Sequence, residues 1–460
     1  MNNMGNKSIG AVTEVATDAL GLESFKQPEK ALESGKVNMI DRVNLNLKKR
    51  YRAERRFKFY GLLSIVFALL CLVVLFTDII GKGHTAFFQS YITLEVELDA
   101  QLLDIQDINN PKQLSNADYQ GVIRKSLRSE FPAVTGRQDK RKLYALLSSG
   151  ASYHLADQVK ADPRLVGQTI QLSVLADDDV DTWLKSRSDD GSEAFTGRLN
   201  SQQLAWLDGL FDAGKLEQKF NAIFFTNGDS REPELAGIRG AIMGSLFTIL
   251  VTFALSFTIG IATAIYLEEY APKNRITDFI EININNLAAV PSIIFGLLGL
   301  AIFIGVFGMQ RSVPLLGGIV LSLMTLPTII ISSRASIKSV PPSIRQAALG
   351  MGASKMQVTL HHVLPLAMPG MLTGTIIGLA QALGETAPLL MIGMVAFVVD
   401  VPGTLTDPST ALPVQIFLWS DSPERAFVER TSAAIMVLLG FLISMNTLAV
   451  WLRRRLERRW

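Results

Sequence analysis

The chain has 460 residues, of which 48% are hydrophobic and 19% are charged, and its formal net charge is +2. This balance argues against a nucleic-acid binder, which usually carries a basic excess, and the single cysteine, Cys71, excludes an intrachain disulfide framework and a cysteine-based zinc site. The mean hydropathy of +0.28 is high for a water-soluble chain, so the composition predicts membrane spans joined to a sizeable polar domain.

The chain opens with a polar segment, residues 1–57, which we predict to be a cytoplasmic tail. A cluster of basic side chains from Lys48 to Lys58 lies at the boundary between this segment and the next. The hydrophobic run that follows lies too deep in the chain for a cleaved signal peptide. Residues 58–81 are therefore predicted to form an uncleaved first transmembrane helix.

Six runs of about 20 mostly apolar residues are long enough to cross a bilayer as helices. Six spans place both termini on one side, and basic clusters at Lys48–Lys58 and Arg453–Arg459 predict that this side is the cytoplasm. The runs lie at 60–77, 241–266, 287–307, 314–331, 370–397 and 433–451.

Residues 82–235, between the first two spans, carry 23 acidic and 17 basic side chains and are long enough to fold independently. The alternation at 169–175 predicts a strand, and the apolar spacing within 204–220 predicts an amphipathic helix. We therefore expect an α+β extracytoplasmic domain. Its run Asp177, Asp178 and Asp179, with Asp181, offers oxygen ligands for calcium but lacks the spacing and the glycine of an EF-hand, so we expect a solvated turn and no metal.

The predicted fold class is mainly α: a polytopic membrane protein with six transmembrane helices and an α+β domain inserted between helices 1 and 2. The predicted limits are 1–57 for the tail, 58–81 for the first helix, 82–235 for the inserted domain, 236–452 for a five-helix membrane domain with a long loop at 334–366, and 453–460 for a basic cytoplasmic tail.

The loop between the fourth and fifth spans is predicted to fold into two short helices. Pro341 and Pro342 end one helix and permit another to begin, while Gly350 and Gly352 allow a sharp turn before a second helix that reaches Pro365. Two short helices with a tight bend form a projection that fits a cleft in another protein.

This loop resembles the EAA loop of ABC-transporter permeases, which docks on the ATPase subunit and transmits its closure to the membrane helices. The chain departs from the family pattern at Gln346, where a glutamate is usual, and at His362, where an aliphatic residue is common. The positions that carry the resemblance, and hence the predicted coupling role, are Gln346, Ala347, Ala348, Gly352, Leu364 and Pro365.

Two further stretches, 286–296 and 384–390, are similar to signatures of PstA-type phosphate permeases, and 325–328 and 340–342 add to the similarity. The resemblance covers 236–452, and the insertion resembles the extra domain of the longer members. It implies a type I ABC importer permease fold in the bacterial inner membrane, forming half of a translocation path for inorganic phosphate. It also implies a paralogous permease subunit, an ATPase homodimer that uses ATP-Mg and a periplasmic phosphate-binding protein, but no enzymatic activity and no cofactor on this chain.

Four side chains are candidates for the translocation path. Glu385 lies in a predicted span, where a carboxylate costs about 2.5–3.5 kcal/mol, so it is expected to act as a gate or to pair with an arginine. Many relatives carry an arginine where this chain has Gln381, one helical turn earlier. Thr386 and Arg334 complete the set, although Arg334 could instead extend to the membrane interface.

Gly370, Gly374 and Gly378 lie four residues apart on one face of the fifth predicted span, a spacing that lets helices approach closely in lipid. Their partner is either another span of this chain or a second permease. The chain contains no G-x-x-x-x-G-K-[ST] motif, so ATP is expected to bind to another polypeptide.

Three alternative functions stay open on the sequence. The first is a permease for another oxyanion, such as sulfate or molybdate. The second is a membrane-anchored receptor that senses through residues 82–235, and the third is a secondary transporter driven by an ion gradient.

Overall fold

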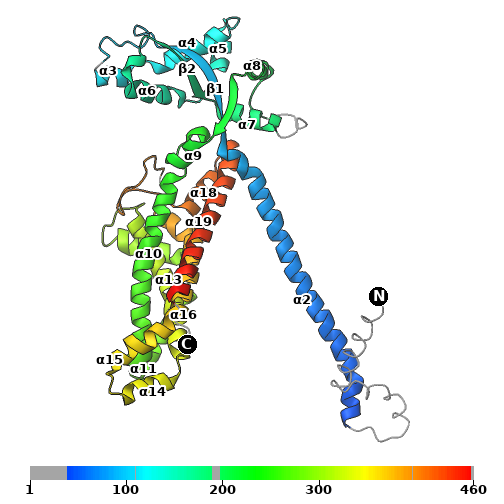
Figure 1. The fold of residues 1–460 in the computed structure, drawn as a ribbon, viewed down its shortest axis with the longest axis vertical. Helices are drawn as coiled ribbons and strands as arrows, with labels where there is room; N and C mark the ends of the chain where they lie inside the picture. Colours follow the sequence, from blue (N-terminus) through cyan, green and yellow to red (C-terminus); the bar gives the residue numbers. More distant parts are fainter. Residues whose placement is uncertain (1–38, 109, 189–196, 396, 457–460) are drawn as a thin grey trace, which may run out of the picture. The chain divides into compact units, whose positions relative to one another are not determined.

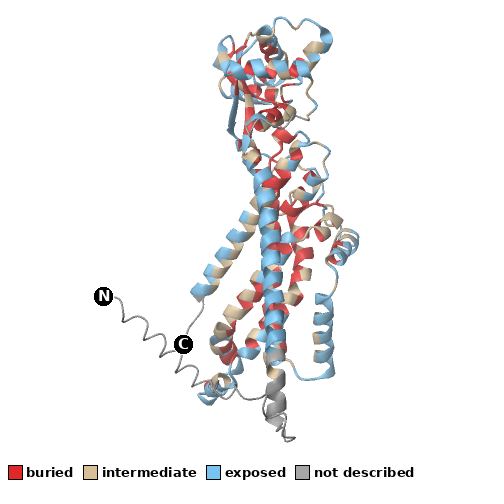
Figure 2. Ribbon diagram, turned by 90° about the vertical axis from the view of Figure 1, so that its right-hand side faces the viewer, coloured by how far each residue is buried: buried red, intermediate tan, exposed pale blue. Residues whose placement is uncertain are grey.

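A computed structural model describes residues 39–108, 110–188, 197–395 and 397–456 (Figure 1). The chain divides into two compact units, Met1–Thr77 and Asp78–Trp460. The described part of the first unit belongs to the long helix α2, which runs from Met39 to Gly83 and whose last six residues are assigned to the second unit. Every side chain from Arg50 to Thr77 is exposed (Figure 2), and most of them beyond Phe59 are apolar, as expected for a helix surrounded by lipid.

The inserted domain contains a three-stranded antiparallel sheet in the order β2-β1-β3, with β1 at Phe88–Glu97, β2 at Thr169–Leu175 and β3 at Leu216–Phe220. The predicted strand at 169–175 is therefore confirmed, and the domain contains both helices and strands. Ile92, Leu94 and Val96 alternate along β1 and are buried beneath the helices. These helices are α3 (Pro111–Asn116), α4 (Tyr119–Glu130), α5 (Arg137–Tyr144), α6 (Ala151–Ala161), α7 (Asp178–Ser188), α8 (Ser201–Asp212) and α9 (Ala222–Thr226).

The predicted helix over 204–220 is wrong in its second half. Helix α8 ends at Asp212, and the chain turns at Gly214, whose φ of +68° is a left-handed conformation that favours glycine. Strand β3 begins two residues later because the turn directs the chain back along β1.

The membrane bundle contains four of the five described helices that are long and apolar enough to span a bilayer, the fifth being α2. A sixth candidate is a pair of helices bent by 105°, so the described residues hold up to six spans. The bundle helices are α10 (Arg239–Ile265), α11 (Arg275–Ala288), α12 (Ser292–Leu298), α13 (Pro314–Ser339), α14 (Pro342–Gly350), α15 (Lys355–Gln357), α16 (Leu364–Gly384), α17 (Ala387–Met391), α18 (Leu412–Ser420) and α19 (Ala426–Leu456). The mainly α, polytopic prediction is confirmed.

Two predicted spans differ from the structure. The third, 287–307, is the second arm of the bent pair, because Pro291 separates α11 from α12. The fifth, 370–397, is shifted along the chain: the helical stretch begins at Lys355, passes through a π-helical turn at Val358–Val363 and ends at Gly384. Consequently, Pro365 does not end a short helix as predicted but lies in the first turn of α16, directly after the π-helical turn at Val358–Val363.

Candidate functional site

The predicted coupling loop forms a helix–turn–helix projection. Helix α14 ends at Gly350, and Gly352 follows with a φ of +88°, the left-handed conformation that reverses the chain. The N–H of Ala353 donates to the carbonyl oxygen of Ala348 at 3.1 Å, which closes the turn. Ser354 then caps the next helix in a reciprocal capping box with Gln357. The predicted sharp turn is therefore present, and its left-handed residue is Gly352.

The outer surface of this projection is apolar. Leu349, Met351 and Met356 are 52%, 79% and 63% exposed, whereas Ala348 is buried against the bundle. Gln346 and Ala347 are exposed on α14, and Leu364 and Pro365 are half-buried at the start of α16. Large apolar side chains on an exposed turn are typical of a surface that another protein covers.

Two ion-pair clusters lie where the projection joins the bundle, and the first of them attaches α14 to it. The guanidinium of Arg345, on α14, donates to the Glu269 carboxylate at 2.9 Å and to the carbonyl oxygens of Ile337 and Val340 at 2.9 and 2.6 Å. Glu269 follows the end of α10, so this arginine connects α14 to both α10 and the end of α13. The connection is rigid because four donor contacts fix one planar side chain.

Arg334 forms the second cluster, at the same end of α13. It lies 2.5 Å from an oxygen of Glu268 and 2.5 Å from an oxygen of Glu281 on α11, and its side chain is 12% exposed. Lys338 adds a weaker contact to Glu268 at 3.3 Å. Arg334 is thus occupied by carboxylates of its own chain. Sequence reasoning missed these partners, although the acidic pair directly after a predicted span was a detectable signal.

The glycine face of α16 packs against α13 of the same chain. A side chain at Gly370 would overlap Ser336, and one at Gly374 would overlap Ser332, whereas Gly378 leaves ordinary van der Waals space. This arrangement selects the intrachain partner from the two predicted alternatives. The absent side chains let the two helix backbones approach closely.

The two signature segments found in the sequence meet in the structure. Gly296 on α12 lies against Pro388 on α17, with no room for a side chain between them. Glu385 and Thr386 occupy the break between α16 and α17, where Glu385 has an extended backbone and both side chains are half-buried. Gln381 lies one turn earlier and is exposed. Glu385 is therefore located in a helix break and not within a continuous span as predicted.

Arg334 does not join this group. Helices α13 and α16 are antiparallel, and Gly370 lies beside Ser336, near Arg334. Glu385 is fifteen residues further along α16, or about 22 Å at 1.5 Å per residue. The four candidates for the path thus separate into Gln381, Glu385 and Thr386 at one end of α16 and Arg334 at the other.

Comparison with known proteins places this geometry in a family. Residues 256–460 match the family "Binding-protein-dependent transport system inner membrane component", and residues 44–194 match a "Domain of unknown function (DUF3333)". The "Phosphate transport system permease protein PstA" of Mycobacterium leprae is 30% identical over 48% of this chain and 72% of that protein. The "PstA 2" protein of Mycobacterium bovis is 32% identical over 49% of this chain and 74% of that protein.

The chain belongs to the PstA-type ABC-transporter permeases. The "Probable ABC transporter permease protein YqgI" of Bacillus subtilis is 30% identical over 36% of this chain, a match that spans only 56% of that protein. Among solved structures, an inward-facing MetNI methionine ABC transporter is 18% identical over 48% of this chain and 96% of that chain, with a TM-score of 0.40. As a member of this family, the chain is a multi-pass membrane transport subunit and not an enzyme.

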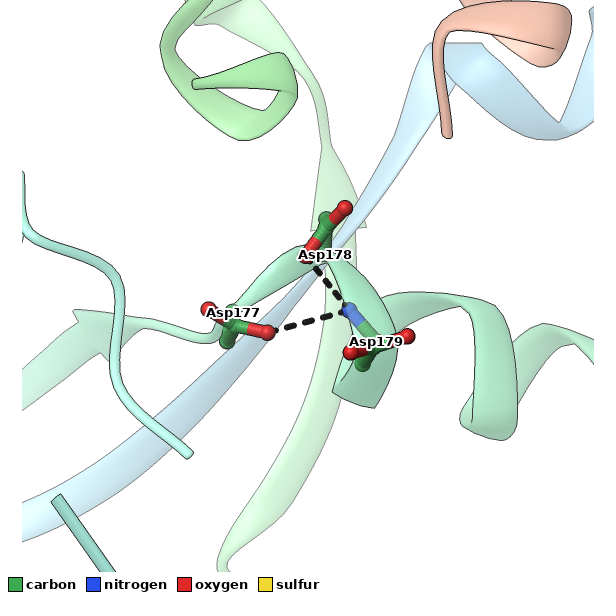
Figure 3. Close-up of side chains that lie close together, drawn as sticks. All are labelled: Asp177, Asp178 and Asp179. Atoms are coloured by element: carbon green, nitrogen blue, oxygen red, sulfur yellow. Dashed lines mark hydrogen bonds between the residues drawn. The ribbon is translucent and has the colours of Figure 1, made fainter. Parts of the chain in front are cut away.

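The acidic run of the permease's inserted domain caps a helix. Figure 3 shows the carboxylates of Asp177 and Asp178 on either side of the Asp179 amide nitrogen, which donates to them at 3.2 and 2.9 Å. Burial, together with repulsion from Asp178, raises the pKa of Asp177 to about 8. The three carboxylates lie within 4.8 Å of one another, but their hydrogen bonds are those of an ordinary helix start. The predicted turn is therefore the first turn of α7, and it is partly buried.

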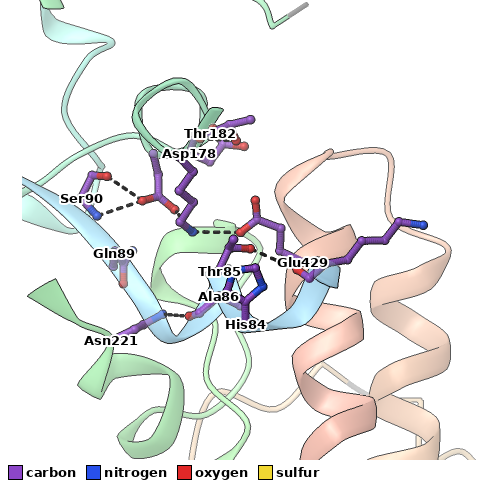
Figure 4. Close-up of polar contacts among 12 residues, drawn as sticks. His84, Thr85, Ala86, Gln89, Ser90, Asp178, Thr182, Asn221 and Glu429 are labelled. Carbon is purple, nitrogen blue, oxygen red and sulfur yellow. Dashed lines mark hydrogen bonds and ion pairs between the residues drawn. The ribbon is translucent and has the colours of Figure 1, made fainter. Parts of the chain in front are cut away.

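A buried ion pair fastens the inserted domain to helix α19. Lys185, on α7, lies 2.6 Å from Asp181 and 2.9 Å from Glu429 on α19, and its side chain is 8% exposed. Ser90, on β1, donates to Asp181 through both its backbone N–H and its hydroxyl, at 2.9 and 2.7 Å. Figure 4 shows Ser90 and Glu429 on opposite sides of this cluster. Asp181 thus has a structural role, which its place in the acidic run did not reveal.

Proposed function

We propose that this permease forms half of the translocation path of an ATP-driven importer of inorganic phosphate. The proposal is supported by the names of its PstA relatives and by the similarity of 286–296 and 384–390 to phosphate-permease signatures. A second, paralogous permease would supply the other half of the path, and a periplasmic phosphate-binding protein would deliver the anion. An ATPase homodimer would bind and hydrolyse ATP-Mg, because this chain lacks a phosphate-binding loop.

The proposed orientation follows from charge. The basic clusters at Lys48–Lys58, in α2, and at Arg453–Arg459, at the end of α19, support an orientation with both termini in the cytoplasm of a bacterial inner membrane and the inserted domain in the periplasm. In this orientation the projection at α14 and α15 would face the cytoplasm, where the proposed ATPase homodimer would bind it. Glu385 and Thr386, at the opposite end of α16, lie toward the periplasm.

The observation that carries the proposed mechanism is the helical continuity between the projection and the path. The stretch from Lys355 to Gly384 is one helical span, so a push on the apolar surface at Met351 and Met356 moves α16 as a lever. The far end of this lever carries Glu385 and Thr386, beside α12. Closure of the ATPase would therefore reorient α16 and α13 together, because the glycine face keeps these two helices in contact.

The Gly352→Val variant tests the coupling role. Valine disfavours a φ of +88°, at a cost of roughly 1–2 kcal/mol, so the turn between α14 and α15 should deform. Gly350→Ala is the matched control, because Gly350 is the last residue of α14 and no atom lies within 4 Å of the position of an added side chain. In proteoliposomes containing the whole complex, the valine variant should lose most ATP-driven phosphate uptake while the alanine variant retains it. Undiminished uptake by Gly352→Val would contradict the mechanism.

The substrate and the alternative functions are tested in the same vesicles. Excess sulfate or molybdate should leave uptake of labelled phosphate unchanged, whereas strong competition by either anion would favour another oxyanion as substrate. Uptake that persists without the ATPase and follows an imposed ion gradient would favour a secondary transporter. Purification of the chain without any ATPase, together with absence of uptake, would favour the receptor.

A further inference from the structure

Three exposed phenylalanines gather at one end of the inserted domain's sheet. Phe88, Phe220 and Phe225, here called the phenylalanine patch, are 48%, 61% and 37% exposed. Phe88 and Phe220 are direct partners in the β1–β3 pairing. The ring of Phe225, on α9, stacks on those of Phe220 and Phe87 at centroid distances of 5.9 Å in both cases. The patch is therefore a contiguous aromatic surface and not a set of isolated side chains.

The patch lies on the same face of the sheet as the buried core residues, beyond the part of that face that the helices cover. Direct partners in an antiparallel pair share one face, and every second pair returns to that face. Ile92 and Leu216 form such a pair and are buried, at 0% and 5% exposed. Four residues back along β1, Phe88 and Phe220 occupy the same face but are exposed. This end of the sheet therefore presents core-type side chains that the described helices of the domain, α9 included, cover only in part.

The patch lies level with the end of a membrane span. The N–H of Ile238 donates to the carbonyl oxygen of Phe224 at 2.8 Å, so Phe225 sits directly above the start of α10. The apolar run of α10 begins at Ala241, three residues later, which is a rise of about 4.5 Å. The headgroup layer on each side of the hydrocarbon is about 5–8 Å thick. A hydrocarbon boundary at Ala241 therefore puts the phenylalanine patch at headgroup depth.

The position of Phe88 along the chain gives the same depth for the part of the patch that lies on β1. Phe88 comes five residues after Gly83, the end of α2, which lies against Ser432 and Met436 where the apolar run of α19 begins. Along β3, the residues between Leu216 and Phe220 are polar and exposed, so the apolar surface is confined to the end of the strand that adjoins the spans. This distribution of apolar side chains is the one expected for contact with a membrane surface, because only the end of the sheet that adjoins the spans can reach that surface.

We propose that the phenylalanine patch inserts into the headgroup–acyl boundary of the adjacent leaflet, so that the inserted domain rests on the bilayer beside its own bundle. Lipid explains why core-type side chains are left uncovered at this depth, because the acyl boundary replaces the missing helix. The lipid contact and the ion pair between Lys185 and Glu429 then support the domain at two separate places. The proposal does not depend on the transported anion.

Site-directed spin labelling tests the proposal in the whole complex in vesicles. Cys71 is the only cysteine, so Cys71→Ser gives a background without reactive thiols. Nitroxides are then placed at Phe220→Cys and at Leu102→Cys. Leu102 is the matched control: it is apolar and 41% exposed, and it lies beyond the far end of β1, about 30 Å along the strand from Phe88.

Oxygen partitions into lipid, whereas a nickel chelate stays in water. The nitroxide's collision rate with oxygen, divided by its collision rate with the nickel chelate, therefore reports its depth in the bilayer. We expect this ratio to be severalfold higher at position 220 than at position 102. Equal ratios would overturn the proposal, as would exclusion of both reagents from position 220, which would indicate a protein partner. Phe225→Cys provides a second position on a different element if the strand variant misfolds, and copurification of the ATPase checks assembly independently of transport.

Discussion

Removal of the Arg345 side chain should uncouple ATP hydrolysis from transport. In the structure its guanidinium holds Glu269 and the carbonyl oxygens of Ile337 and Val340. The Arg345→Ala variant leaves the Glu269 carboxylate, which is 11% exposed, without its cation. Helix α14 would then be attached to the bundle mainly through the backbone at Val340 and through the buried side chain of Ala348.

The magnitude follows from burial. Breaking a fully buried ion pair costs about 3–5 kcal/mol, but the Arg345 side chain is 24% exposed, so water replaces part of the lost contacts. We therefore expect a loss of about 2–3 kcal/mol in the free energy that holds α14 in place. Lys338→Ala is the control, since Lys338 is 62% exposed and 3.3 Å from its carboxylate. Its loss should be no more than about 0.5 kcal/mol.

The assay is the number of anions imported per ATP hydrolysed by the reconstituted complex. Arg345→Ala should retain ATP hydrolysis and import fewer anions per ATP, because the projection moves without turning α10 and α13. Arg345→Lys keeps the charge but loses the planar donor fork, so it should give an intermediate ratio. The reasoning is refuted if Arg345→Ala imports as many anions per ATP as Lys338→Ala and the unsubstituted complex.

Two other outcomes can be measured on the purified permease. Gly374→Val should destabilise the bundle by roughly 1–3 kcal/mol in thermal unfolding, because the valine side chain would overlap Ser332. Gly378→Ala should be nearly neutral. Equal effects of the two substitutions would contradict the close packing of α16 against α13. Burial raises the pKa of Glu234 from 4.5 to about 7, so the folded domain keeps a proton that the unfolded chain releases. The contribution of Glu234 to the free energy of unfolding is therefore greatest below pH 4.5 and falls by up to about 3 kcal/mol as the pH rises to 7. Glu234→Gln should flatten that part of the curve, and an unchanged pH profile would refute this assignment.

The sequence predicted which segments are apolar enough to cross the membrane better than it predicted where their helices bend or break. Hydropathy reports the composition of a segment and not the direction of its backbone, so the 105° bend at Pro291 and the break at Glu385 were both read as continuous helix. In the inserted domain, the strand at 169–175 was predictable from its alternation. The strand after Gly214 was not, because its apolar spacing imitates a helix until the left-handed turn is known.

The candidate site shows the same limit. The local signals for the projection lie within a few residues of one another, and Gly352 has the conformation that its place in the motif predicts. Contacts between distant segments left no such signal: the approach of Gly296 to Pro388 and the pairing of Arg345 with Glu269 depend on how helices pack. The charges at helix ends were visible in the sequence, but their partners required the fold.

The buried cluster around Lys185 has a practical consequence for measuring helix movements during transport. Because Lys185 is held by Asp181 of its own helix and by Glu429 of α19, the inserted domain and that helix should tilt as a single body. A fluorophore or an antibody fragment attached to the domain's outer surface would then report the angle of a membrane helix from the aqueous side, without any label inside the bilayer.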